Sequence, residues 1–186
     1  MIIEKKKLFV NIIYSISVVF YVVIGAGVLT IASYDFTEKT VLLSVLILLS
    51  SIPHILLYLI NKNNSYLIIG LVGLAFSILF LTVRETDLFT ADHICMIWGV
   101  IDICRGLTEI INVLPKVKKH KIELIEIGVS LGDIVIGTLL CIHLTHGTRL
   151  HLIYLAIAVF IIAAKTVFEY IFEKVRKKED EGLDNN

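Results

Sequence analysis

Six apolar segments follow one another along this chain, and each is long enough to cross a lipid bilayer. About twenty residues of α-helix span the roughly 30 Å hydrocarbon core of a membrane, where a helix satisfies its own backbone hydrogen bonds. Hydrophobic residues make up 57% of the sequence, above the roughly 45–50% that is usual in soluble domains. The sequence therefore predicts an all-α, polytopic membrane protein. Its six transmembrane helices are expected at about residues 8–33, 40–60, 65–84, 90–114, 122–145 and 148–172.

The polar connections between these segments are short, which predicts a single transmembrane domain over residues 1–186. The first apolar run is about twice as long as the 7–15 residues of a signal peptide, so we expect it to stay as the first span. The last residues, 175–186, are strongly charged. They are expected to form a cytoplasmic tail that extends the last helix.

Lysine and arginine are distributed unequally between the two sides of the predicted bundle. Twelve fall on one side: Lys5, Lys6, Lys7, Lys62, Lys116, Lys118, Lys119, Lys121, Lys174, Arg176, Lys177 and Lys178. Three fall on the other: Lys39, Arg84 and Arg149. Because basic loops stay in the cytoplasm, both termini are predicted to be cytoplasmic in a multi-pass protein of the cell membrane. The 17 basic and 17 acidic residues cancel, which argues against a nucleic-acid partner.

The helices pair in sequence as three similar hairpins, at about residues 8–62, 65–118 and 122–174. The odd helices carry glycine near their centres, and the even helices end in polar residues before a basic loop. Every unit starts and ends in the cytoplasm, so the three hairpins are predicted to be parallel repeats around an axis along the membrane normal. The GVSLG run at 128–132 is expected to let a further helix approach closely.

Six spans in three hairpin repeats, with glycine in the odd helices and little outside the membrane, resemble the HdeD-like acid-resistance membrane proteins. The resemblance covers nearly the whole chain and is one of architecture. It implies a stress-linked membrane protein without established catalysis. It assigns no functional residue to this sequence.

Three ionisable residues interrupt the fourth apolar segment, inside the run Trp98 to Asn112. At 100° per residue, Asp102, Arg105 and Glu109 fall within roughly a 60° sector of a helix. A charged side chain in contact with lipid is costly. This face of the helix is therefore expected to meet protein or water.

The fifth segment carries acids at matching depths. Because helices four and five are expected to be antiparallel, Asp133 should lie level with Asp102, and Glu126 level with Glu109. We expect Arg105 to pair with Asp133, Asp102 or Glu126. The residues of the fifth segment that can face the fourth form a heptad-like seam: Glu126, Ser130, Asp133, Gly137 and Cys141.

Lys165 and Glu169 of the sixth segment enter the same half of the bundle. The predicted buried polar cluster is thus Asp102, Arg105, Glu109, Glu126, Asp133, Lys165 and Glu169. Five acids outnumber two bases, and three unpaired negative charges are unfavourable in a low-dielectric interior. Some carboxyls are therefore expected to hold a proton at neutral pH. The cluster is a candidate proton or ion path; the alternative is a salt-bridge network that only fixes helix packing.

Motifs of catalysis and of resident cofactors are missing from the sequence: HExxH, GxSxG, the P-loop pattern and GxGxxG. The three cysteines lack CxxC spacing, so no zinc module and no disulfide framework is predicted. Four histidines, His93, His143, His146 and His151, fall toward the outer side. They are read as loop residues, as a pH-sensitive patch or, through the HLTH spacing, as a metal site. Pro53 is expected to kink the second helix and free a carbonyl near His54.

Two functions fit these observations. The first is a non-enzymatic stress or acid-response membrane protein with a buried cluster that takes up protons. The second is a small proton-coupled transporter or channel whose path is the cluster. A third interpretation is structural, as a homo-oligomer or as a partner within a membrane complex. In each case the lipid bilayer is the surrounding partner.

Overall fold

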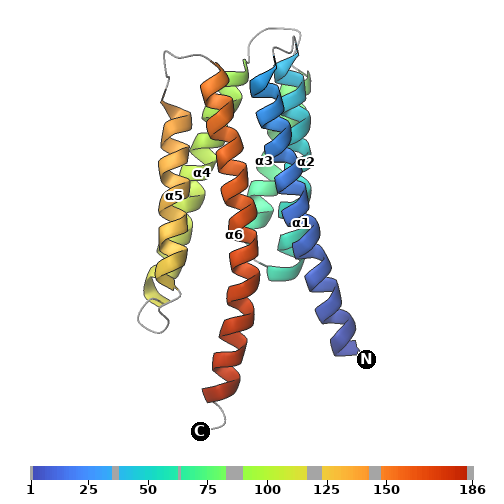
Figure 1. Ribbon diagram of the computed structural model, residues 1–186, viewed down its shortest axis with the longest axis vertical. Helices are drawn as coiled ribbons and strands as arrows, with labels where there is room; N and C mark the ends of the chain where they lie inside the picture. The colour runs from blue at the N-terminus through green and yellow to red at the C-terminus, as the bar shows by residue number, and fades with distance from the viewer. Residues whose placement is uncertain are drawn as a thin grey trace.

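The computed structural model describes residues 2–34, 38–62, 64–82, 90–116, 123–142 and 148–183. This part of the chain forms six α-helices that lie lengthwise in one bundle (Figure 1). They are α1 (Ile2–Ser33), α2 (Lys39–Asn61), α3 (Asn64–Thr82), α4 (Ala91–Val113), α5 (Glu123–Cys141) and α6 (Thr148–Leu183). The all-α prediction is confirmed, and the helices coincide closely with the six predicted apolar segments.

Four of these helices, α1, α2, α5 and α6, are long and apolar enough to cross a membrane. α3 has a shorter apolar stretch, Tyr66–Thr82. α4 is 23 residues long but carries the charges described above. The structure thus has the helices of a membrane protein.

The two termini lie at the same end of the bundle, where α1 and α6 extend beyond the other helices (Figure 1). α6 continues without interruption to Leu183. The strongly charged residues as far as Leu183 are therefore part of this helix. α4 ends where Pro115, which has no backbone N–H, enters a short 3-10 turn, η2 (Leu114–Lys116).

Three helix pairs have the most extensive contacts: α4 with α5, α1 with α6, and α2 with α3. α1 also packs on α2, and α5 on α6. α4 touches both other even-numbered helices, α2 and α6, inside the bundle. This arrangement directs the charged face of α4 toward α5 and α6.

Glycine allows α4 and α5 to pack backbone to backbone. A Cβ atom on Gly106 would lie 2.6 Å from the Ser130 carbonyl oxygen, so any larger residue would collide there. The expectation that GVSLG receives a further helix is wrong within the described chain, since no atom lies within 4 Å of a Cβ built on Gly128 or Gly132. The reason is rotational: the α5 face that meets α4 is that of Ser130, and these two glycines point elsewhere.

The outside of the bundle is apolar. Along α1, Ile12, Ile16, Val19 and Val23 are all exposed at helical spacing. On a soluble protein such a stripe is unusual, whereas lipid covers it at no cost. Inside the bundle, serine and threonine hydroxyl groups donate hydrogen bonds to backbone carbonyls of their own helix. The hydroxyl of Ser77, for example, donates to the Gly73 carbonyl at 2.6 Å. This satisfies polar groups without water.

Candidate functional site: a charged network and its cavity

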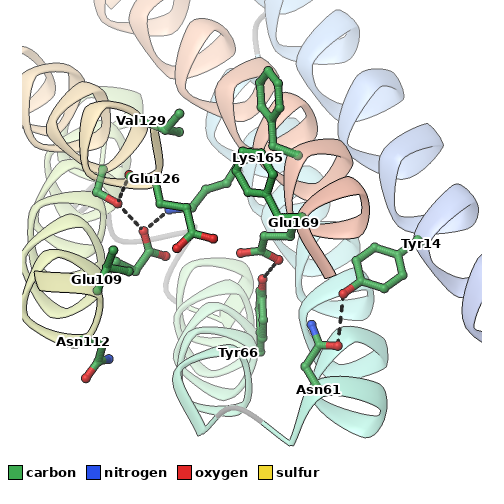
Figure 2. Close-up of a pocket in the computed structure, with 13 residues that line it drawn as sticks. Tyr14, Asn61, Tyr66, Glu109, Asn112, Glu126, Val129, Lys165 and Glu169 are labelled. Atoms are coloured by element: carbon green, nitrogen blue, oxygen red, sulfur yellow. Dashed lines mark hydrogen bonds and ion pairs between the residues drawn. The ribbon is translucent and has the colours of Figure 1, made fainter. Parts of the chain in front are cut away.

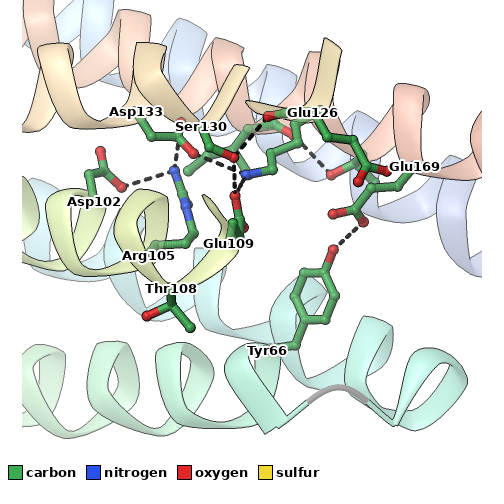
Figure 3. Close-up of polar contacts among 12 residues, drawn as sticks. Tyr66, Asp102, Arg105, Thr108, Glu109, Glu126, Ser130, Asp133 and Glu169 are labelled. Atoms are coloured by element: carbon green, nitrogen blue, oxygen red, sulfur yellow. Dashed lines mark hydrogen bonds and ion pairs between the residues drawn. The ribbon is translucent and has the colours of Figure 1, made fainter. Parts of the chain in front are cut away.

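Arg105 of α4 lies at the deep end of a buried charged network (Figure 3). Its Nη2 atom is 3.1 Å from Oδ1 of Asp102, one helical turn away, and 3.1 Å from Oδ1 of Asp133 on α5. The three residues are almost fully buried, with exposed fractions of 8%, 1% and 2%. The predicted pairing of Arg105 is thereby confirmed for Asp102 and Asp133.

Lys165 of α6 continues the network. Its Nζ atom donates to Oδ2 of Asp133 at 3.1 Å and to Oε2 of Glu109. Asp133 therefore uses one carboxylate oxygen for Arg105 and the other for Lys165. The result is a connected chain of charges, from Asp102 through Arg105, Asp133 and Lys165 to Glu109, held by three helices.

Ser130 of α5 contacts Glu109, the residue at the cavity end of this chain of charges. Its hydroxyl lies 2.9 Å from both Oε2 of Glu109 and the backbone carbonyl of Glu126 and can donate to either. Four residues of the predicted α5 seam do face α4: besides Ser130 and Asp133, Gly137 meets Gly99, and the thiol of Cys141 lies 3.6 Å from the Met96 carbonyl. Counting residues from the middle of two antiparallel helices was therefore sufficient to predict that α4 and α5 meet along these faces.

A cavity of about 250 Å³ adjoins the charged network (Figure 2). It lies in the half of the bundle nearer the termini, because its walls include the end of α2 and the beginnings of α3 and α5. Its lining residues come from all six helices: Tyr14, Asn61, Tyr66, Glu109, Asn112, Val113, Glu126, Val129, Ser130, Lys165, Phe168, Glu169 and Phe172. The cavity thus brings carboxylates, one ammonium group and aromatic rings around one space.

All seven predicted cluster residues meet at this place. Asp102, Arg105 and Asp133 form the deep end. Glu109 and Lys165 link this end to the cavity, and Glu126 and Glu169 are in the cavity wall.

Several polar residues at the cavity were not predicted from the sequence. The Tyr66 hydroxyl of α3 donates to Oε2 of Glu169, and the Tyr14 hydroxyl donates to Oδ1 of Asn61 at 3.1 Å (Figure 2). The signal for Tyr66 was its place in the first turn of α3, at the same depth as Glu169. Depth alone, however, does not say which way a side chain points around its helix.

The charge balance of the site is acidic. Arg105 and Lys165 each lie between two carboxylates, and Glu126 and Glu169 bring the number of acids to five. If all seven groups were ionised, they would carry a net charge of −3, with Asp102, Arg105 and Asp133 buried and the other four half-buried at the cavity. Such an excess is costly inside a membrane. It favours the uptake of protons or of another cation.

A second buried polar pair lies beside the network, between α1 and α2. Nδ1 of His54 is 3.0 Å from the Tyr21 hydroxyl and 2.8 Å from the Ser50 carbonyl. α2 continues as a helix through Pro53. Pro53 has no N–H to donate to the carbonyl of Leu49, four residues earlier in the helix. The imidazole contacts the next carbonyl, that of Ser50.

The opposite end of the bundle differs from the predicted histidine patch. His151 is buried; its Nδ1 lies 2.9 Å from Oδ1 of Asp92, and its Nε2 lies 3.0 Å from the Ile142 carbonyl. His93 is exposed and accepts the Thr90 backbone N–H at the start of α4. His143 and His146 lie outside the described residues. Within the described ranges, no group of three metal-binding side chains occurs.

All three cysteines are free thiols, at positions 95, 104 and 141.

Comparison with known proteins gives no relationship: no family model, no curated protein and no solved structure matches the chain. The function is therefore inferred from the geometry of the site.

Proposed function

We propose that the chain is a multi-pass protein of the cell membrane with six transmembrane helices and both termini in the cytoplasm. The apolar stripe of α1 and the length of α2, α5 and α6 support this. For α4 the support lies in its charges, which contact α5 and α6 and are therefore kept from lipid. The common end of the two termini and the lysine-rich loops predicted there support the orientation.

The three hairpin repeats are part of the same proposal. In a three-fold arrangement of hairpins, the contacts α2–α3, α4–α5 and α6–α1 are equivalent, and these are the three most extensive helix pairs. Within the hairpins, α1 packs on α2 and α5 on α6, whereas the described parts of α3 and α4 have no comparable contact. In each pair, a Cβ atom built on a glycine of the odd-numbered helix would lie less than 3 Å from an atom of the even-numbered helix. The glycines and the residues that they face are Gly73 and Ser51, Gly137 and Gly99, and Gly25 and Phe160.

For the activity, we propose a small proton-coupled transporter or channel whose path is the seven-residue polar cluster. The observation that carries the proposal is the connected chain from Asp102 to Glu109, which runs from the buried middle of α4 into a charge-lined cavity. A purely structural salt bridge needs no such space. Alternating carboxylates and bases within hydrogen-bonding distance are the arrangement expected of a membrane proton relay.

A second candidate function is a non-enzymatic stress or acid response, as the resemblance to the HdeD-like proteins implies. The observation that favours it is the pairing of Arg105 and Lys165, each held by two carboxylates. A network of this kind can stabilise the bundle and take up protons on acidification without transporting anything. The two functions therefore differ in flux, and not in proton uptake.

Flux in proteoliposomes separates the two candidates. We would impose a pH gradient and follow internal pH for the native protein, for Asp133→Asn and for Glu109→Gln. Glu38→Gln, at an exposed carboxylate before α2, is the matched control. Transport requires flux in the native protein and the control and its loss in both cluster variants, with unchanged helicity. Native protein that is folded but gives no flux would leave the acid-response function.

A further inference from the structure

The cavity beside the charged network has the size of a small molecule. Its volume of about 250 Å³ is just below the roughly 300–1,000 Å³ of typical small-molecule pockets. A water molecule or a bare metal ion leaves most of this space empty. A small organic molecule fills it.

The charge of the wall selects the sign of the occupant. Glu109, Glu126 and Glu169 line the cavity, and Lys165 is the single base among the described residues that line it. Lys165 already contacts Glu109 and the buried Asp133. A cationic occupant therefore reduces the negative excess, whereas an anion adds to it.

The wall also contains four aromatic rings, those of Tyr14, Tyr66, Phe168 and Phe172. Aromatic faces attract organic cations, and cages of such rings recognise alkylated ammonium groups. Inorganic cations such as Na⁺ and K⁺ instead favour a complete shell of oxygen ligands. Carboxylates together with aromatic rings thus favour an organic cation over an inorganic one.

One of these cavity carboxylates, that of Glu109, already accepts an ammonium group within the protein. Lys165 is in the cavity wall beside Glu109 (Figure 2), and its ammonium group donates to two acids from different helices, Glu109 and Asp133. An incoming ammonium ion meets the same kind of acceptor at Glu169, which the Tyr66 hydroxyl holds in the wall.

We propose that this cavity binds a small organic ammonium ion. Binding stands on the cavity alone; the exchange of the ion against protons rests, in addition, on the transport function proposed above. Each ammonium ion that binds takes the place of one proton, so its uptake releases that proton from a protonated carboxyl group of the cluster. No covalent step is involved.

The test is equilibrium binding of radiolabelled choline to the full-length protein in lipid nanodiscs at neutral pH. The discriminating competitor is the neutral isostere of choline, in which carbon replaces the ammonium nitrogen. We expect saturable binding that unlabelled choline displaces and the isostere and K⁺ do not. Glu169→Gln should weaken binding by about tenfold or more, while Glu38→Gln should leave it unchanged.

A second measurement does not depend on a variant that folds. A carbodiimide that enters apolar spaces modifies the cavity glutamates of the native protein, and mass spectrometry locates the adducts. Choline should slow modification of Glu109, Glu126 and Glu169, and the isostere should not. The proposal is overturned if choline does not bind, if the isostere competes equally, or if choline leaves the three glutamates unprotected.

The proton flux of the preceding experiment is measured without choline, so the two proposals fail separately. Choline binding without flux supports an ammonium-binding protein that does not transport. Flux without choline binding supports a proton path and overturns the ammonium site.

Discussion

Gly99 of α4 and Gly137 of α5 face each other with no room for a side chain between them. A Cβ atom on either glycine would lie 2.6 Å from the backbone carbonyl oxygen of the other. Because both obstacles are backbone atoms, a change of rotamer cannot relieve the collision. This contact sets the distance between α4 and α5, and that distance in turn lets Arg105 reach Asp133 at 3.1 Å.

We predict that Gly137→Ala separates α4 from α5 and destabilises the protein by about 1–3 kcal/mol, the usual cost of overpacking. Gly132→Ala is the matched control in the same helix, because nothing lies within 4 Å of its Cβ position. Thermal unfolding in detergent, followed by circular dichroism, measures both. Equal melting temperatures for the two variants would contradict the close contact of the helices.

Replacing Arg105 by alanine leaves Asp102 and Asp133 without their shared cation. Removing one partner of a buried ion pair typically costs about 3–5 kcal/mol, so we expect a large loss of stability at neutral pH. The loss should shrink at acidic pH, since protonated carboxyls carry no charge to repel one another. Arg149→Ala, at an exposed arginine of α6, is the control. An equal loss at every pH would argue against stranded carboxylates.

The two buried aspartates should differ in their contribution to folding. Among the described residues, Asp133 contacts both Arg105 and Lys165, whereas the ion pair of Asp102 is with Arg105 alone. Because Asp133 lies between two cations, we predict that Asp133→Asn destabilises the protein more than Asp102→Asn does. Unfolding of both variants in the same detergent decides the order.

At the opposite end, His151 of α6 joins α4 through Asp92 at 2.9 Å. We predict a coupling energy of about 0.5–3 kcal/mol between the two side chains, as is usual for residues in direct contact. The measurement is a double-mutant cycle with His151→Phe and Asp92→Asn, scored by unfolding free energy. Additive effects of the two substitutions would mean that this contact contributes nothing to stability.

Much of the site was predictable because one helix pair is governed by periodicity. The spacing of Asp102, Arg105 and Glu109 gives them a common face, and the antiparallel count brings Asp133 opposite that face. Lys165 could be assigned to the correct half of the bundle. Its insertion between Asp133 and Glu109 could not, because the rotation of α6 about its own axis depends on packing against α1, α4 and α5.

The sequence by itself determined the number, order and approximate limits of the helices. Each apolar run is long and must satisfy its backbone hydrogen bonds internally, and this is a local property of the chain. Only the tertiary structure decided that Tyr14, Tyr66 and Phe172, from three different helices, surround one cavity with the charged cluster. A helix fixes which of its residues share a face, but the close contacts among all six helices decide which faces meet and where space is left between them.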